Sequence, residues 1–164
     1  MKKLITICLL LATTFTVKAQ DAKPTKEETL AFMKRTLEAT IGYNAPGKGK
    51  ILEIKFSGDY YFYKAYYDLG DTGFTNYSTT SLINWEKIKP DFIIFKDANS
   101  LTEVKISFSN SMKIKQQVSD QPERDFFNSQ ATFYVSTEKK ESFKKACLRL
   151  AEIAKEENKD PFEK

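Results

Sequence analysis

The chain has 164 residues, with 26 basic and 22 acidic side chains and no histidine. Without histidine, Ser-His-Asp and Cys-His nucleophile pairs and histidine zinc sites are excluded, and a single mature cysteine, Cys147, cannot replace them. Three of the 26 basic residues (Lys2, Lys3 and Lys18) belong to a leader, which leaves 23 basic against 22 acidic residues, without the charge excess of a nucleic-acid-binding protein. We therefore predict no metal site, no cofactor and no nucleic-acid partner.

The first residues have the three parts of a secretory signal peptide. Lys2 and Lys3 form a basic n-region, residues 4–11 are apolar, and Val17-Lys18-Ala19 supplies small residues at a cleavage site. The apolar run is shorter than the ~20 residues that span a bilayer, and no later run is long enough. We predict a signal peptide over residues 1–19, cleavage after Ala19, no transmembrane segment, and a soluble product that is periplasmic or secreted.

After a polar leader over residues 20–24, the length of residues 25–164 fits one globular domain. The tetrapeptide Thr25-Lys26-Glu27-Glu28 is a capping box, in which the Thr25 hydroxyl and the Glu28 carboxylate satisfy free amides at a helix start. The pattern predicts a helix over about 25–41, stopped by Gly42, and a loop over 44–50. Its apolar face comprises Leu30, Met33, Leu37 and Ile41.

Between residues 51 and 136 the apolar period changes from about 3.6 to 2, which predicts β-strands. The expected strands cover about 51–57, 60–67, 74–82, 92–95, 102–108, 112–118 and 131–135. Leu52, Ile54 and Phe56 are expected to face inward in the first strand, and residues 92–95 to be fully buried. Ser109-Asn110 is expected to join the fifth and sixth strands as a short hairpin.

The fifth and sixth expected strands each have one apolar and one polar face. In the fifth, Thr102, Val104, Ile106 and Phe108 are expected to face inward, and Glu103, Lys105 and Ser107 outward. In the sixth, Met112, Ile114, Gln116 and Val118 are expected inward, against Lys113, Lys115 and Gln117. A final helix over about 138–157 follows, capped by Ser136 or Thr137, with Cys147 in its apolar stripe as a buried core thiol.

The element order predicts an α+β fold, with about seven antiparallel strands in a bent sheet or partly closed barrel between an N-terminal and a C-terminal helix. Cystatin-like and lipocalin-like folds are alternatives. Seven strands and one C-terminal helix resemble the pleckstrin-homology-like barrel over roughly residues 51–157. The stretch Ser-Leu-Ile-Asn-Trp-Glu-Lys-Ile over 81–88 looks like the exit of that superfamily's third strand.

Two features of the phosphoinositide-binding pleckstrin-homology members are missing from the sequence. Their long basic first hairpin loop is replaced by the short acidic Ser57-Gly58-Asp59, and the expected last helix contains no tryptophan. The chain also looks like short secreted bacterial proteins of unassigned role, which end in an amphipathic helix and a tail such as Asp160-Pro161-Phe162. This second resemblance implies no activity for the chain.

The tripeptide Asp71-Thr72-Gly73 is the one motif that suggests catalysis. It carries the catalytic carboxylate of aspartic proteases, in which two aspartates share a proton. One copy would require a homodimer, as in the retroviral enzymes that the tripeptide resembles. Phe74 replaces the usual small residue, and the glycines around Asp71 equally favour a polar turn between two strands. A carboxylate-dependent hydrolase is therefore the alternative function.

The strand at 60–67 indicates binding, because tyrosine suits surfaces that are apolar yet partly wet. Alternation places Tyr61, Tyr63 and Tyr67 on one side and Tyr60, Phe62 and Tyr66 on the other. One of these sides is expected to build the core. We predict an exported, non-catalytic binding domain for a protein, glycan or lipid. Its candidate ligand-binding residues are Tyr61, Tyr63, Tyr67 and Trp85, with Trp85 as an anchor of the barrel edge or a stacking platform.

Overall fold

The computed structural model describes residues 23–45, 49–98 and 100–159. The predicted signal peptide, its cleavage site and the 160–162 tail lie outside these residues. Along the chain the described elements follow in the order α2, β1 to β4, η1, β5 to β7, η2 and α3, so four of them are helical. Their bounds are α2 Lys26–Glu38, β1 Asn44–Ala45, β2 Gly49–Phe56, β3 Tyr60–Asp68, β4 Gly73–Ser81, η1 Trp85–Lys87, β5 Ile88–Ala98, β6 Leu101–Val118, β7 Arg124–Ser136, η2 Thr137–Lys139 and α3 Lys140–Glu157.

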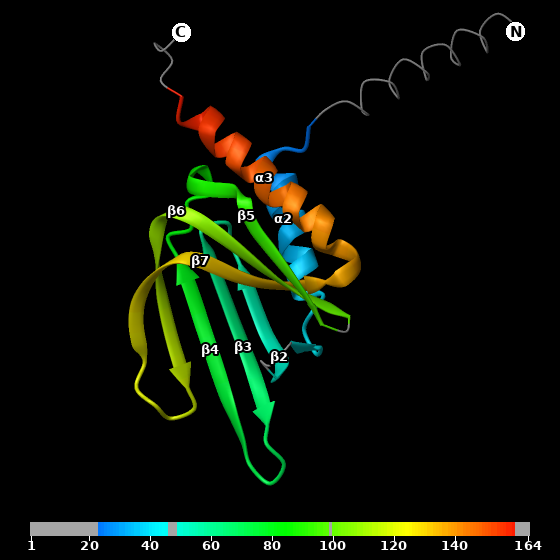
Figure 1. Ribbon diagram of the computed structural model, residues 1–164, viewed down its shortest axis with the longest axis vertical. Helices are drawn as coiled ribbons and strands as arrows, with labels where there is room; N and C mark the ends of the chain where they lie inside the picture. Colours follow the sequence, from blue (N-terminus) through cyan, green and yellow to red (C-terminus); the bar gives the residue numbers. More distant parts are fainter. Residues whose placement is uncertain (1–22, 46–48, 99, 160–164) are drawn as a thin grey trace, which may run out of the picture.

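The described strands form a seven-stranded antiparallel sheet in the order β1-β2-β3-β4-β6-β5, with β7 also paired to β6. The 18-residue β6 holds this sheet together. Its first part pairs with β5, its last part pairs with β4, and β7 pairs with both parts. Because β6 bends between these parts, the sheet curls into a half-barrel (Figure 1). The predicted α+β class with a bent antiparallel sheet and flanking helices is confirmed.

The two long helices lie side by side and cover one side of the curled sheet (Figure 1). The predicted capping box is present at α2, where Thr25 Oγ1 accepts from the Glu28 amide and Glu28 accepts from the Thr25 amide. From α3, Phe143 and Cys147 enter the core, and burial raises the pKa of the Cys147 thiol. Cys147 is therefore the core thiol that its apolar stripe predicts. The same core cluster contains other fully buried side chains, among them Met33, Leu37, Ile106, Phe108, Phe133 and Val135.

The expected hairpin at Ser109-Asn110 is wrong, because both residues lie inside the continuous strand β6. A two-residue hairpin favours positive φ at its turn, and neither residue has one. The β6–β7 register instead shifts between Ser107 and Met112, a bulge that bends β6 without ending it. Hydrogen bonding to β7 on both sides of the bulge keeps the two parts in one strand.

Two expectations about burial in the strands are also wrong. Leu52 is exposed, because a register irregularity between Ile51 and Glu53 turns Ile51 to the core instead, while Ile54 and Phe56 face inward as expected. The strand expected over 92–95 is longer and is only half covered, with Phe92 and Ile94 exposed. The reason is that β5 is the last strand of the sheet order and has one apolar layer against it, whereas a fully buried strand needs two.

The ends of several elements differ from their predicted limits. The first helix ends at Glu38, three residues early, and a series of turns follows it, which leaves Ile41 exposed. The expected loop over 44–50 contains the short strand β1 and the start of β2. The last strand begins at Arg124 and not near residue 131, since its polar first half pairs with the end of β6. Ser136 precedes η2 as its N-cap residue but makes no side-chain capping bond.

Candidate functional site

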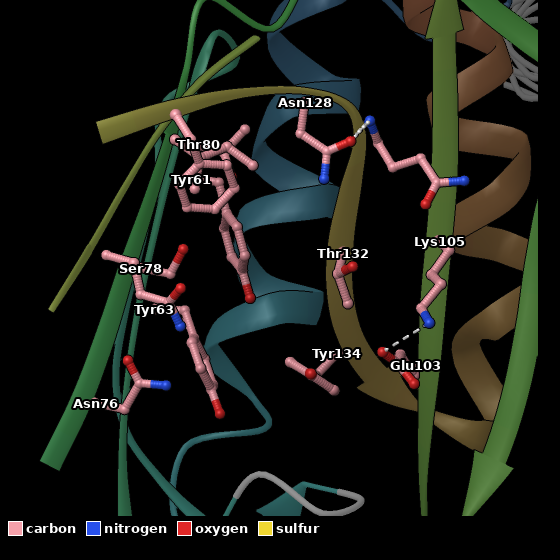
Figure 2. A pocket seen from close by; sticks show the side chains of 14 residues that line it. Tyr61, Tyr63, Asn76, Ser78, Thr80, Glu103, Lys105, Asn128, Thr132 and Tyr134 are labelled. Carbon is pink, nitrogen blue, oxygen red and sulfur yellow. Dashed lines mark hydrogen bonds and ion pairs between the residues drawn. The ribbon is translucent and has the colours of Figure 1, made fainter. Parts of the chain in front are cut away.

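The concave side of the half-barrel contains a cleft of about 340 Å³, lined by side chains from β3, β4, β6 and β7 (Figure 2). Its volume lies at the lower end of the range for small-molecule sites, ~300–1,000 Å³. Figure 2 shows two facing walls: one carries Tyr61, Tyr63 and Asn76, and the other carries Thr132 and Tyr134. Most of the lining is polar, unlike the hydrophobic core between the sheet and the helices, to which Tyr61, Tyr63 and Tyr134 also belong.

The first wall follows from strand register, because directly opposed residues of an antiparallel pair share a face. In β3 and β4, Tyr61 is opposite Thr80, and Tyr63 is opposite Ser78. The same face continues from β4 into β6, because Ser78 is also opposite Gln116 of β6. Alternation therefore places a hydroxyl or amide from each of these three strands in the cleft.

The second wall contains one ion pair. Glu103 is opposite Tyr134, and Lys105 is opposite Thr132, so β6 and β7 present these side chains together. The Glu103 carboxylate lies 3.6 Å from Lys105 Nζ and its side chain is only 9% exposed. The expectation that Glu103 points outward to solvent is therefore wrong. The curl of the sheet covers the polar face of β6 at Glu103, whereas the side chain of Lys105 stays 43% exposed.

Two polar atoms of the first wall are buried without a hydrogen-bond partner in the described chain, Tyr61 Oη and Asn76 Oδ1. Tyr61 is 3% exposed and Asn76 is 9% exposed. The backbone of Tyr134 lies near the Tyr61 hydroxyl and slightly opposes the effect of burial on its pKa, but makes no hydrogen bond of normal geometry to it. Such atoms are uncommon in native proteins, and each calls for an explanation.

The tyrosine hydroxyls of the cleft stay neutral. Burial raises the pKa of Tyr61, Tyr63 and Tyr134 above the ordinary tyrosine value, and neighbouring tyrosines or Glu103 raise it further. These hydroxyls are therefore uncharged at physiological pH and can donate as well as accept hydrogen bonds.

The structure brings together two of the four sequence-predicted binding residues. Tyr61 and Tyr63 line the cleft, whereas Tyr67 lies outside it, half-buried and stacked on Phe74 at a centroid distance of 4.5 Å. Trp85 is buried on the helix-covered side, where its Nε1 donates to Gly58 O at 2.9 Å. Its ring contacts Phe108 and Phe133.

The other side of β3 presents Tyr60, Phe62 and Tyr66 away from the cleft, and Tyr66 is the most exposed of the three. Phe62 contacts Tyr77 of β4 at a centroid distance of 6.0 Å. This side offers no lining residue to the cleft, so the two tyrosine sets that alternation separates have different surroundings.

Asp71 lies in the exposed turn between β3 and β4. That turn is closed by the Leu69 amide, which donates to Thr72 O at 2.8 Å, and by Asp68 Oδ1, which accepts from the Gly70 amide at 3.0 Å. The hairpin extends away from the helices, and Asp71 is not among the cleft residues. Within the described ranges, no group of three or more His, Cys, Asp or Glu side chains is arranged to hold a metal ion.

Sequence reasoning missed Asn76 and Glu103 as members of the site. Asn76 begins an Asn-Tyr-Ser sequence that matches a glycosylation sequon, but its burial in the cleft wall is incompatible with that use. The alternation of Glu103 with Val104 indicates that this strand has one polar face. Alternation alone does not show that the sheet curls over that face. Knowledge of the curl was needed to find both.

Comparison of the chain with family models, with curated proteins and with solved structures finds no match. None of the helices in the described residues is long and apolar enough to cross a membrane. The geometry of the cleft is therefore the basis for any statement about function.

Proposed function

We propose that this protein is an exported, non-catalytic binding domain whose ligand occupies the polar cleft of the half-barrel. The observation that supports the proposal is the pair of buried atoms without partners, Tyr61 Oη and Asn76 Oδ1, on adjacent strands of one cleft wall. A ligand with hydrogen-bonding groups would satisfy both.

The energetics of burial support this role. A buried polar group without a partner lowers stability by ~1–3 kcal/mol, so two such groups on one wall are unfavourable for folding alone. A preorganised site accepts this penalty, because the ligand then forms hydrogen bonds to groups that are already desolvated and oriented. The open cleft lies next to both atoms, whereas the helix-covered side of the sheet is filled by apolar side chains.

The leader and the fold resemblance complete the proposal. The basic, apolar and small-residue parts of residues 1–19 support export to the periplasm or the medium. The resemblance to pleckstrin-homology-like barrels supports a binding role over a catalytic one. Within the described residues, no observation favours the hydrolase alternative at Asp71, which lies on a hairpin turn outside the cleft.

Export is tested by expressing the full chain in a Gram-negative host and sequencing the N-terminus of the product in each fraction. We expect Gln20 as the first residue of protein recovered from the periplasm or the medium. An intact Met1 on protein confined to the cytoplasm would contradict the localisation.

Binding in the cleft is tested with one blocking variant and one matched control. Ser78→Phe places a ring in the cleft, and Thr79→Phe places the same ring on the other face of β4, where Thr79 is opposite Phe62 and Lys115. A thermal-shift screen of neutral saccharides, sugar phosphates, dipeptides and fatty acids should find a compound that raises the melting temperature of the wild type and of Thr79→Phe. Ser78→Phe should lose that response. An equal response of both variants, or no response of the wild type to any class, contradicts the proposal.

A further inference from the structure

We propose that the ligand of the cleft is a small neutral saccharide, an inference that rests on the proposed binding function. It starts from the chemistry of the lining, which is dominated by hydroxyl and amide side chains. Each of these groups can donate and accept hydrogen bonds, as the hydroxyls of a sugar do. The amide members are Asn76, Gln116, Asn128 and Gln130, and the hydroxyl members include Ser78, Thr80, Thr132 and the three tyrosines.

The charges of the cleft favour a neutral ligand. The two charged lining residues are Glu103 and Lys105, and they pair with each other at 3.6 Å. No lining residue that the structure describes offers an unpaired charge that could pair with a charged ligand. Binding a charged ligand in this partly desolvated site is therefore unfavourable. The tyrosine hydroxyls do not supply one either, since burial raises the pKa of Tyr61, Tyr63 and Tyr134.

The two atoms without partners select against an apolar ligand. A lipid chain in the cleft would complete the desolvation of Tyr61 Oη and Asn76 Oδ1 and give them no hydrogen bond. One sugar hydroxyl can donate to Asn76 Oδ1, and another can accept from Tyr61 Oη or donate to it. Phe126, 40% exposed, adds an aromatic surface to the cleft lining on which the apolar face of a sugar ring can rest.

The strand pairing makes an extended peptide a weaker fit than a sugar. Extended peptides bind most often by adding a strand to a free sheet edge. Of the four strands that line the cleft, β3, β4 and β6 are each paired on both sides, and in the described part of the chain only β7 is paired on one side. The cleft therefore presents mainly side chains, and a peptide is kept as an outcome of the test.

The test measures binding of glucose, galactose, mannose, N-acetylglucosamine, maltose and cellobiose to the purified protein by isothermal titration calorimetry. We expect at least one of them to bind the wild type in a saturable manner. Tyr61→Phe removes the hydroxyl and keeps the ring, so it should weaken that binding about three- to tenfold. The matched control Tyr60→Phe, on the other face of β3, should bind like the wild type.

Asn76→Ala is a second variant with the same expected three- to tenfold loss, and it keeps the test decisive if Tyr61→Phe is poorly folded. Saturable binding of only glucose 6-phosphate, dipeptides or fatty acids would overturn the saccharide inference and leave the binding function in place. Equal affinity of Tyr61→Phe, Asn76→Ala and the wild type for the sugar would also overturn it. No binding by any class would overturn both, and would mean that ordered water satisfies the two atoms.

Discussion

Two adjacent residues of β7 show how differently the two sides of this sheet are used. Phe133 is 0% exposed and faces the hydrophobic core, where its ring contacts those of Trp85 and Phe143 and that of Tyr61, which also lines the cleft. Tyr134 is 3% exposed on the cleft side, near Tyr63 and Glu103. Burial is nearly the same and both residues belong to the core cluster, but Phe133 is surrounded by aromatic rings, whereas Tyr134 also lines the polar cleft.

This contrast teaches that the degree of burial does not by itself identify a structural core. The helix-covered side gains free energy from apolar area and close packing. The cleft side leaves volume unfilled and two polar atoms without partners, which reduces stability and prepares a surface for hydrogen bonding. Truncating an apolar core side chain and removing the unpartnered Tyr61 hydroxyl should therefore change the free energy of unfolding in opposite directions.

The largest expected effect is at the centre of the helix-covered side. Phe133→Ala should lower the free energy of unfolding by ~3–5 kcal/mol, because it removes apolar contacts and leaves a cavity among three rings. The control is Phe127→Ala, on the same strand but 70% exposed, which should change it by less than about 0.5 kcal/mol. Urea unfolding followed by circular dichroism measures both, and equal values for the two variants would contradict the assignment of the core.

A smaller loss is expected for Trp85→Phe. The change keeps an aromatic ring but removes the Nε1 donor to Gly58 O, which leaves a carbonyl on the helix-covered side without that partner. The free energy of unfolding should fall by ~1–3 kcal/mol. Urea unfolding must again be followed by circular dichroism, because Trp85 is the only tryptophan of the chain. A change within experimental error would show that water replaces the lost donor.

The opposite sign is expected for Tyr61→Phe. In the absence of ligand, removing a buried hydroxyl without a hydrogen-bond partner should raise the free energy of unfolding by about 1 kcal/mol, while the ring contact with Phe133 is kept. Tyr60→Phe, on the outer face, should leave it unchanged. A loss of stability as large as that of Trp85→Phe would mean that the hydroxyl is satisfied, and the contrast between the two sides would fail.

The smallest effect concerns acid stability at the edge next to the helices. The side-chain hydrogen bonds from Lys140 and Thr102 hold the pKa of Asp97 below its ordinary value of 3.8. Because the pKa is lower in the folded state, this contribution is present above pH 3.8 and is lost as the pH falls toward the folded pKa. Asp97→Asn and Lys140→Gln should each flatten the dependence of the melting temperature on pH below about 4. An unchanged slope in both variants would contradict the pairing.

Local sequence patterns predicted those elements of the fold that depend only on residues close together in the sequence. The capping box at Thr25, the stripe around Cys147 and the alternation in β3 depend on neighbours within a turn or a strand. Tyr61 and Tyr63 were found for the same reason, since an aromatic strand with two tyrosine faces is visible without a structure. The sequence did not show which side of β3 faces the cleft, because alternation is symmetric between the two faces.

The remaining features depend on contacts far apart in the sequence. The continuity of β6 through Ser109-Asn110 is decided by its pairing with β7, and the enclosure of Glu103 is decided by the curl that follows from the β6 bulge. Sequence alone determined that this is an α+β chain with an apolar helix-covered side and no histidine chemistry. Tertiary structure decided that the polar face is folded inward and that Tyr61 and Asn76 line the same cleft, because curvature and register arise from long-range strand pairing and not from local periodicity.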